Sequence, residues 1–279
     1  MRHRCSIVLS FILPVLIVGA GCSAQRRVST ETSLATALVS DEQSVQIGEQ
    51  VHAELASKGV RYVDDRQVTG YVESVAGKIF DLARRDRSGV AFHVHVIDDA
   101  KTVNAFASPG GHVYVYSGLL LAADNEAEVA GVLAHESGHV AGRHVERAMA
   151  NAYGLQVLAA MALGKDPSGT QQLAASLIGT GLVRAHSRSE EIEADEYGAR
   201  YISQLGYDPH ALITFFQKLQ AGESRTPVVL AWLNTHPVSG ERISHLGDYI
   251  AKNGLSGSAL GQEQHRAIKQ HLEAPARRS

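Results

Sequence analysis

The sequence predicts an α+β fold that is mainly helical and contains one small sheet. Between residues 41 and 253, most apolar residues recur at the spacing of about 3.6 residues that gathers them on one side of a helix. Residues 92–97 instead alternate with a period of two, as a strand does. The chain has 279 residues, of which 44% are hydrophobic, and this suffices for one sizeable domain with extensions at its ends.

The N-terminal residues have the pattern of a bacterial secretory signal. Arg2 and Arg4 precede an apolar run over residues 7–21, which is short for a membrane span. The run ends in Gly19-Ala20-Gly21-Cys22, which resembles a lipobox, so Cys22 is expected to become the lipidated first residue of the mature chain. Ordinary signal cleavage and an uncleaved signal anchor are the alternatives.

Two helices are expected before the first strand. Apolar residues follow helical spacing over residues 41–57, after Ser40 or Asp41 as the N-cap, and again over residues 65–85.

The predicted sheet is formed by three short strands. Residues 103–107 and 112–117 read as strands joined by a Ser-Pro-Gly-Gly turn. If residues 93–97 pair with the second of them, the first lies at the sheet edge, where an extended peptide can add as a further strand. A purely structural hairpin is the alternative. His93 and His95 could form a metal pair on their strand, but we expect them to be polar-face residues.

The motif Ala134-His135-Glu136-Ser137-Gly138-His139 lies within a helical pattern. Two histidines four residues apart lie one turn apart on the same side of a helix, so both imidazoles can reach one metal ion. Glu136 projects beside that ion and can transfer a proton. This is the His-Glu-x-x-His arrangement of zinc peptidases, and a chance match is the alternative.

The helix that carries this motif is expected to pack closely. Asp124 is a candidate N-cap, and Gly131, Gly138 and Gly142 each weaken an isolated helix by about 1 kcal/mol relative to alanine. Such glycines indicate close approach of another backbone. His144 is expected to point away from the motif and to be structural.

A catalytic zinc ion needs a third protein ligand and an open position. The acid-rich segment at residues 187–195 begins another helix, in which Glu191 and Asp195 share a face. One of them can bind zinc while the other accepts a hydrogen bond from a ligand imidazole. A solvated acidic first turn is the alternative, and the spacing does not choose Glu191 over Glu190 or Glu193.

Four further helices are expected in the second half of the chain, and neither of the first two is long or hydrophobic enough for a confident membrane span. They are assigned to residues 151–163, 171–186, 209–220 and 241–253, before a polar tail at residues 254–279.

Five motifs occur in order along residues 41–250. They are Asn104-Ala105-Phe106-Ala107-Ser108-Pro109-Gly110-Gly111, Tyr116-Ser117-Gly118-Leu119-Leu120, His135-Glu136-x-x-His139, Ser187-Arg188-x-x-Glu191-x-x-Ala194-Asp195-x-x-Gly198 and Thr235-His236-Pro237. Together they resemble the CAAX-prenyl-protease and Oma-type family of zinc metallopeptidases, and most of all its short periplasmic lipoproteins related to the β-barrel-assembly-enhancing protease.

The resemblance implies a zincin fold of the glutamate-ligand type (gluzincin), in which an edge strand lines the active-site cleft. It implies that His135, His139 and Glu191 bind one Zn²⁺ per chain. It also implies that Glu136 is the catalytic base and that Asp195 orients a ligand histidine.

Two further site assignments follow from the resemblance. Asn104, Ala105 and Phe106 resemble a substrate-binding edge strand. His236 is placed near zinc, either as a donor to the oxyanion or in the open coordination position, with a capping or packing role as the alternative. Pro237 suits the start of the following helix. Arg242 and Tyr201 are possible neighbours to which the sequence assigns no role.

The expected function is hydrolysis of misfolded or unassembled envelope proteins in the bacterial periplasm, by Glu-assisted attack of zinc-bound water. We expect a lipid anchor at Cys22, to the outer membrane. The segments are a lipoprotein signal peptide at 1–21, a flexible tether at 22–40, a zinc metallopeptidase domain at 41–253 and the polar tail at 254–279.

Other classes fit less well. A net charge of −3 and the lack of a glycine-rich phosphate motif give no case for nucleic-acid binding. A zinc oxidoreductase or deaminase is disfavoured because cysteine ligands and cofactor motifs are missing. The remaining alternative is a proteolytically restrained chaperone or binding protein for envelope proteins.

Overall fold

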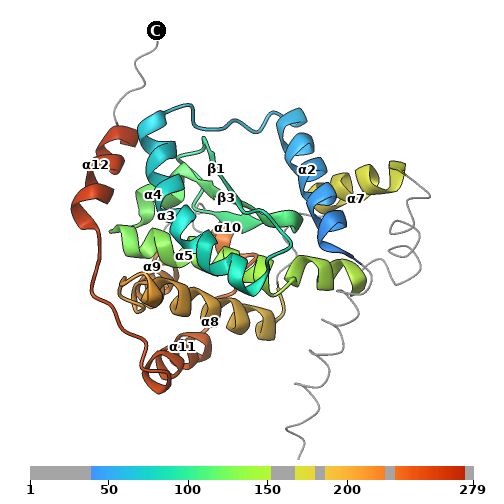
Figure 1. The fold of residues 1–279 in the computed structure, drawn as a ribbon. Helices are drawn as coiled ribbons and strands as arrows, with labels where there is room; N and C mark the ends of the chain where they lie inside the picture. The colour runs from blue at the N-terminus through green and yellow to red at the C-terminus, as the bar shows by residue number, and fades with distance from the viewer. Residues whose placement is uncertain (1–38, 152–166, 180–185, 224–229, 274–279) are drawn as a thin grey trace, which may run out of the picture.

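A computed structural model describes residues 39–151, 167–179, 186–223 and 230–273. These residues form a mainly helical molecule with one small sheet (Figure 1). The elements are α2 (Asp41–Ser57), α3 (Arg66–Asp86), β1 (His93–Ile97), β2 (Ala105–Ala107), the 3₁₀ turn η1 (Pro109–Gly111), β3 (His112–Tyr116), α4 (Ser117–Ala122), α5 (Glu126–Ala141), α7 (Pro167–Gly179), α8 (Arg188–Gln204), α9 (Ala211–Glu223), α10 (Leu230–Leu233), α11 (Gly240–Lys252) and α12 (Gln262–Glu273).

Some expectations concern residues outside this description. They are the signal peptide, the lipidation site at Cys22, nearly all of the tether, nearly all of the helix expected at residues 151–163, and part of the helix expected at residues 171–186. None of the described helices is long and apolar enough to cross a membrane.

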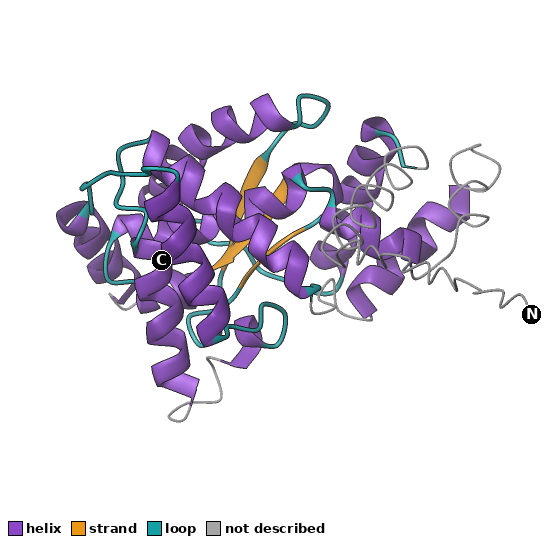
Figure 2. Ribbon diagram, turned by 90° about the horizontal axis from the view of Figure 1, so that it is seen from below, coloured by secondary structure: helices purple, strands orange, loops and turns teal. Residues whose placement is uncertain are grey.

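The three strands form a mixed sheet in the order β1-β3-β2. β1 runs parallel to β3, with His93 opposite His112, and β2 runs antiparallel to β3, with Ala105 opposite Val115. The strand predicted at residues 103–107, observed as β2, therefore lies at the sheet edge as expected. Helices lie on both sides of this sheet (Figure 2).

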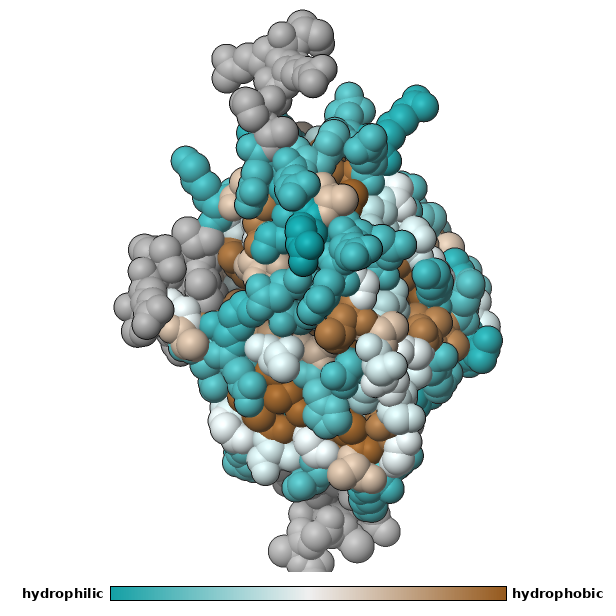
Figure 3. Space-filling model, turned by 90° about the vertical axis from the view of Figure 1, so that its left-hand side faces the viewer, coloured by the Kyte–Doolittle hydropathy of each residue, from teal (hydrophilic) through white to brown (hydrophobic). Residues whose placement is uncertain are grey.

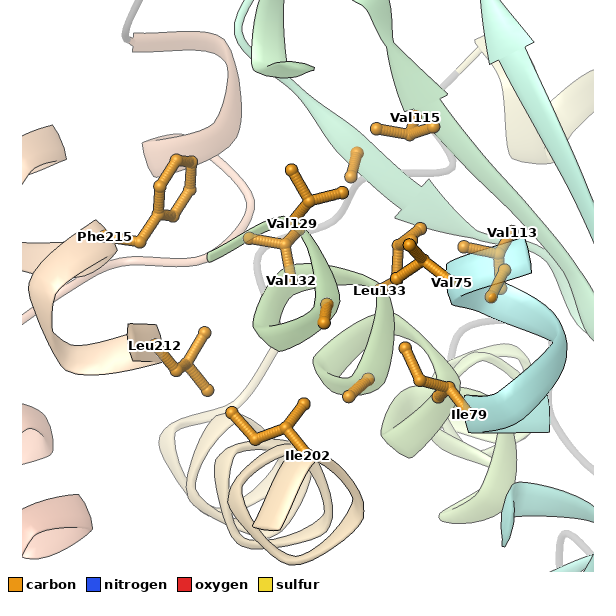
Figure 4. Close-up of a cluster of buried hydrophobic side chains, with 14 of the residues drawn as sticks. Val75, Ile79, Val113, Val115, Val129, Val132, Leu133, Ile202, Leu212 and Phe215 are labelled. Atoms are coloured by element: carbon orange, nitrogen blue, oxygen red, sulfur yellow. The ribbon is translucent and has the colours of Figure 1, made fainter. Parts of the chain in front are cut away.

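The larger hydrophobic core lies between one face of the sheet and the helices α3, α5, α8 and α9 (Figure 4). α5 lies at its centre, and every residue from Glu126 to Val140 is buried. The expected close approach at its glycines is confirmed for Gly138, where an added Cβ would lie 3.0 Å from the carbonyl oxygen of Ala194 on α8. Glycine at this position therefore lets α8 pack directly against the motif helix.

The opposite face of the sheet packs against α2 and α7. Strand residues alternate between the two faces, so Val113 and Val115 enter the larger core while Tyr114 joins Ile47 and Val51 of α2 in a second core. α7 closes this second core with Leu173 and Leu177.

A buried ionic network joins α2, α3 and a further helix that begins at His144. The guanidinium of Arg87, at the C-terminus of α3, lies 2.8 Å from Glu146 and 2.9 Å from Asp41. Arg87 also donates to the carbonyl oxygen of Val140, 2.7 Å away. Burial raises the pKa of Glu146, but Arg87 and Ser44 more than offset this effect and hold that pKa below its ordinary value.

We expect Glu146→Ala to lower the free energy of unfolding by about 3 kcal/mol, because it leaves the buried guanidinium of Arg87 with Asp41 as its remaining carboxylate partner. Denaturant unfolding measures this. The control is Asp81→Ala, which removes an exposed partner of Arg84 and should cost less than about 1 kcal/mol.

The same carboxylate predicts a pH dependence. Since the folded-state pKa of Glu146 is lowered, its contribution to the free energy of unfolding is present above about pH 4.5 and is lost as pH falls below that value. Equal acid sensitivity of wild type and Glu146→Ala would contradict this assignment.

Two details differ from the sequence-based expectations. Asn125, rather than Asp124, caps α5, and its side chain accepts from the backbone N–H of Glu128.

The segment expected to be a polar tail contains α12, which packs against α3, α4 and α5. Its few apolar residues, Ile268 and Leu272, pack against the larger core, and buried His265 adds a polar contact 3.0 Å from the hydroxyl of Tyr71. The side of the molecule that carries α12 is largely hydrophilic (Figure 3).

Candidate metal centre

Four possible metal ligands meet at the centre of the larger core. His135 and His139 come from α5, Glu191 from α8, and His236 from the segment after α10. Nε2 of His139 lies 3.0 Å from Nε2 of His135 and 3.4 Å from Oε1 of Glu191. Nδ1 of His236 lies 3.0 Å from the same oxygen and 3.3 Å from Nε2 of His135. The four offered atoms all lie within 4.8 Å of one another.

These residues fit a zinc ion. Two nitrogens bound tetrahedrally at about 2.0–2.1 Å from zinc would be about 3.3 Å apart, which is close to the observed separations. Imidazoles and a carboxylate are also donors that zinc accepts. Beside them, Oε1 of Glu136 is buried without a hydrogen-bond partner and lies 3.4 Å from Nε2 of His236. The cluster thus combines four donors with one carboxylate that can accept a proton.

The start of α8 explains why Glu191, of the three candidate glutamates, faces the cluster. Ser187 caps this helix, and Glu190 completes the capping box by accepting from the backbone N–H of Ser187. Glu193 points to another side, where it lies 3.2 Å from Nε2 of His144. Glu191 and Asp195, one turn apart, are turned toward α5 and are both buried.

Asp195 and Arg242 lie directly behind the cluster. Oδ1 of Asp195 is 2.8 Å from Nδ1 of His135. Arg242 on α11 contacts both carboxylate oxygens of Asp195, at 2.5 and 2.8 Å, and lies 2.5 Å from Oε2 of Glu191. Sequence reasoning assigned Arg242 no role, since only the packing of α11 against α8 brings it here. Tyr201, the other possible neighbour, instead donates to Asp86 at 2.6 Å.

Burial and neighbouring charges control the ionisation of the cluster. Burial raises the pKa of Glu191, but the nearby His236 and Arg242 hold it well below its usual range, so Glu191 is a carboxylate. Burial, with His186 beside it, lowers the pKa of His139 far below its ordinary value. A carboxylate and a neutral imidazole are the forms that bind metal ions.

His144 was expected to point away from the motif, and this expectation is wrong. Its Nδ1 lies 2.7 Å from Nδ1 of His139. The expectation assumed a continuous helix, but α5 ends at Ala141 and Arg143 adopts a positive φ of 55° before the next helix begins. The turn brings the His144 ring back behind His139. The sequence analysis also missed His186, whose ring stacks on His139 at a centroid distance of 4.0 Å.

His236 is positioned by its contacts with α10. Its backbone N–H donates to the carbonyl oxygen of Trp232, 2.9 Å away, and its ring stacks on the Trp232 indole at 4.6 Å. The helix expected at residues 241–253 is observed as Gly240–Lys252 with Ser239 as its cap, so Pro237, which suits a helix start, lies before it. His236 therefore belongs to the end of α10 rather than to the start of α11.

The predicted edge strand lies against the motif helix. β2 packs on α5, and the side chains of Asn104, Ala105 and Phe106 are all buried. The ring of Phe106 stacks on Tyr114 at 4.6 Å, in the second core. Any substrate contact with this strand would therefore be made first by its backbone at the sheet edge.

Comparison with known proteins identifies the family. The model of the family described as peptidase family M48 matches residues 65–250. The mitochondrial metalloendopeptidase OMA1 of Schizosaccharomyces pombe is 36% identical over 183 residues, which are 65% of this chain and 53% of that protein.

Two proteins of Escherichia coli are also similar. The beta-barrel assembly-enhancing protease is 31% identical over 215 residues, 72% of this chain and 42% of its own. Metalloprotease LoiP is 39% identical over 161 residues, 56% of this chain and 62% of its own. The chain thus spans about half the length of the curated relatives it matches. With the family match covering most of its length and including both the His-Glu-x-x-His helix and Glu191, this chain belongs to peptidase family M48.

Proposed function

We propose that this protein is a zinc-dependent endopeptidase with a zincin-type fold, in which His135, His139 and Glu191 hold one Zn²⁺. The observation that carries this proposal is the convergence of these three donors beside the buried, unpartnered carboxylate oxygen of Glu136. Membership of a metallopeptidase family supports it.

Each residue of the cluster has a defined part in the proposed reaction. Zinc held there would polarise the scissile carbonyl group and lower the pKa of a water molecule toward about 7. Glu136 would take the proton of this water and return it to the leaving amine. Asp195 would hold the Nδ1 proton of His135 and so keep Nε2 free as a donor atom. Arg242 would keep Asp195 and Glu191 ionised and in place.

We further propose that the substrates are misfolded or unassembled proteins of the bacterial cell envelope. The name of one relative from Escherichia coli, a protease that enhances β-barrel assembly, supports this substrate class. The lipobox-like sequence before Cys22 supports a lipid anchor in the periplasm, at the outer membrane. An extended substrate would add to the edge of β2, beside Asn104, Ala105 and Phe106.

A second candidate function is supported by the position of His236. It offers a fourth donor to the cluster, and all four donors are at most 2% exposed. A catalytic zinc site needs an open position, so a protein resting in this arrangement would hydrolyse slowly and could instead hold unfolded envelope proteins.

The proposed function is tested with the purified mature chain and an unfolded protein substrate. We expect cleavage that stops when a strong chelator removes the metal and returns on addition of stoichiometric Zn²⁺. Cleavage that persists in metal-free protein would contradict the proposal.

His236→Ala distinguishes the two possible roles of this histidine. If His236 occupies the open position at rest, its removal should raise the initial rate, roughly tenfold if about a tenth of the molecules are open in the wild type. If it donates to the oxyanion, the rate should fall by about 10²–10³. We expect the rise, and rates compared at equal zinc occupancy decide the question. His245→Ala, which removes an exposed histidine paired with Glu196, should leave the rate unchanged.

A further inference from the structure

A second histidine cluster lies on the opposite face of the sheet from α5. It contains His52 of α2, His95 of β1 and His112, the first residue of β3 (Figure 1). Each residue offers one ring nitrogen, and these nitrogens lie within 4.8 Å of one another. From the sequence, His95 was expected to be a polar-face residue, because the motif helix offers a better metal site; the two partners that His95 has here are distant in the chain.

The hydrogen bonds around these rings leave donor atoms available for a metal ion. Nδ1 of His52 lies 3.2 Å from the hydroxyl of Tyr114. A proton on that nitrogen leaves the lone pair of Nε2 free. Nε2 of His95 lies 3.0 Å from Nδ1 of His112, so these two nitrogens already face each other at the spacing of two ligands of one ion.

The far side of the His112 ring has the surroundings of a metal ligand. Its Nε2 is buried and has no hydrogen-bond partner, and the nearest carboxylate oxygen, Oε1 of Glu49, is 3.6 Å away. A metal-bound histidine commonly donates its other ring N–H to a carboxylate. Glu49 is 60% exposed, so it can move a few tenths of an ångström to accept that hydrogen bond.

A metal-free ring stack is the competing explanation. The rings of His52 and His95 are 4.3 Å apart, and those of His95 and His112 are 5.2 Å apart and nearly parallel. Burial, together with the neighbouring histidines, lowers the pKa of His95 to about 3. Stacking alone accounts for these rings, with a hydrogen bond between Nε2 of His95 and Nδ1 of His112. With or without a metal ion, a proton on Nε2 of His112 faces Glu49, which leaves Nδ1 as the atom that His112 can offer to an ion.

We propose that His52, His95 and His112 form a second site for a divalent transition-metal ion, with Glu49 as the carboxylate partner of His112. Three imidazole ligands are an established ligand set for Zn²⁺. Because the ligands come from a helix and two strands, the bound ion would fix α2 to the sheet. This site is separate from the proposed catalytic centre and does not depend on it.

The site is tested by zinc content and thermal unfolding of the full mature chain. We expect the wild type to retain two equivalents of zinc and His95→Phe to retain one, with its peptidase activity unchanged. Phenylalanine keeps the ring stack but removes the ligand. Added Zn²⁺ should raise the melting temperature of chelator-treated wild type more than that of His95→Phe. Glu49→Gln should weaken the second equivalent by about 10–100-fold.

Two controls separate this site from the catalytic centre. His245→Gln should retain both equivalents, whereas Glu191→Ala should lose one and keep the equivalent that His95→Phe removes. The proposal is overturned if wild type and His95→Phe bind the same amount of zinc and show the same zinc-dependent shift in melting temperature. Failure of the proposed peptidase would be seen separately, as unchanged zinc content in Glu191→Ala.

Discussion

Glu136→Gln is expected to reduce peptide hydrolysis by at least about 10²–10⁴-fold, the range typical of acid–base catalysis, while the protein stays folded and keeps its zinc. Glutamine has nearly the same shape as glutamate but cannot take a proton from water. Glu136 is 1% exposed and its Oε1 has no hydrogen-bond partner. The substitution therefore removes the base and breaks no hydrogen bond of that oxygen.

The measurement is the initial rate of cleavage at equal zinc content, with circular dichroism to confirm the fold. Glu263→Gln, an exposed residue of α12, is a matched control that should cleave at the wild-type rate. Both variants pass through the same purification, so a contaminating protease would appear in each. Equal hydrolysis by Glu136→Gln and wild type in clean preparations would refute Glu136 as the base.

Glu191→Ala is expected to lose one equivalent of zinc and all measurable hydrolysis. The carboxylate is the only described acidic side chain whose oxygen lies among the nitrogens of His135, His139 and His236. Its loss leaves two of the three proposed zinc ligands, removes the oxygen that lies 3.0 Å from Nδ1 of His236, and leaves the buried guanidinium of Arg242 facing the ion without that negative charge. Asp195→Asn should behave differently, because Asp195 contacts His135 from behind: it should keep the ion but bind it about 10–100-fold more weakly.

Metal analysis after dialysis against graded chelator concentrations measures both effects. Glu190→Ala is the matched control, since Glu190 is the preceding residue of the same helix and serves its capping box. It should keep zinc and activity. Full zinc retention by Glu191→Ala, with loss in Glu190→Ala or Glu193→Ala, would show that a different carboxylate binds the metal.

The residues of the proposed catalytic site reach it in two ways. His135, Glu136 and His139 are local to one helix, whereas Glu191 and His236 reach the site through the packing of α8 and the position of α10. Arg242 adds a buried guanidinium that contacts both Glu191 and Asp195. We therefore regard Arg242 as a positioning residue of the proposed site.

Features that depend on short chain separations could be predicted from the sequence. The spacing of His135 and His139, the shared face of Glu191 and Asp195, and the alternation at residues 92–97 all follow from the geometry of single helices and strands. These local rules predicted α2 with its observed bounds, the helical character of α5 and α8, and the edge position of β2.

Which of these residues meet became clear from the three-dimensional structure. The structure selects Glu191 over Glu190 and Glu193, because Glu191 lies on the face of α8 that packs against α5. Glu190 instead takes part in the capping box of α8, and Glu193 contacts His144. The structure also showed that α12 packs against α3, α4 and α5, where a polar tail was expected. It brought His52, His95 and His112 together across α2, β1 and β3. The physical reason is that periodicity fixes the direction of a side chain relative to its own element, whereas long-range contacts depend on how the elements pack.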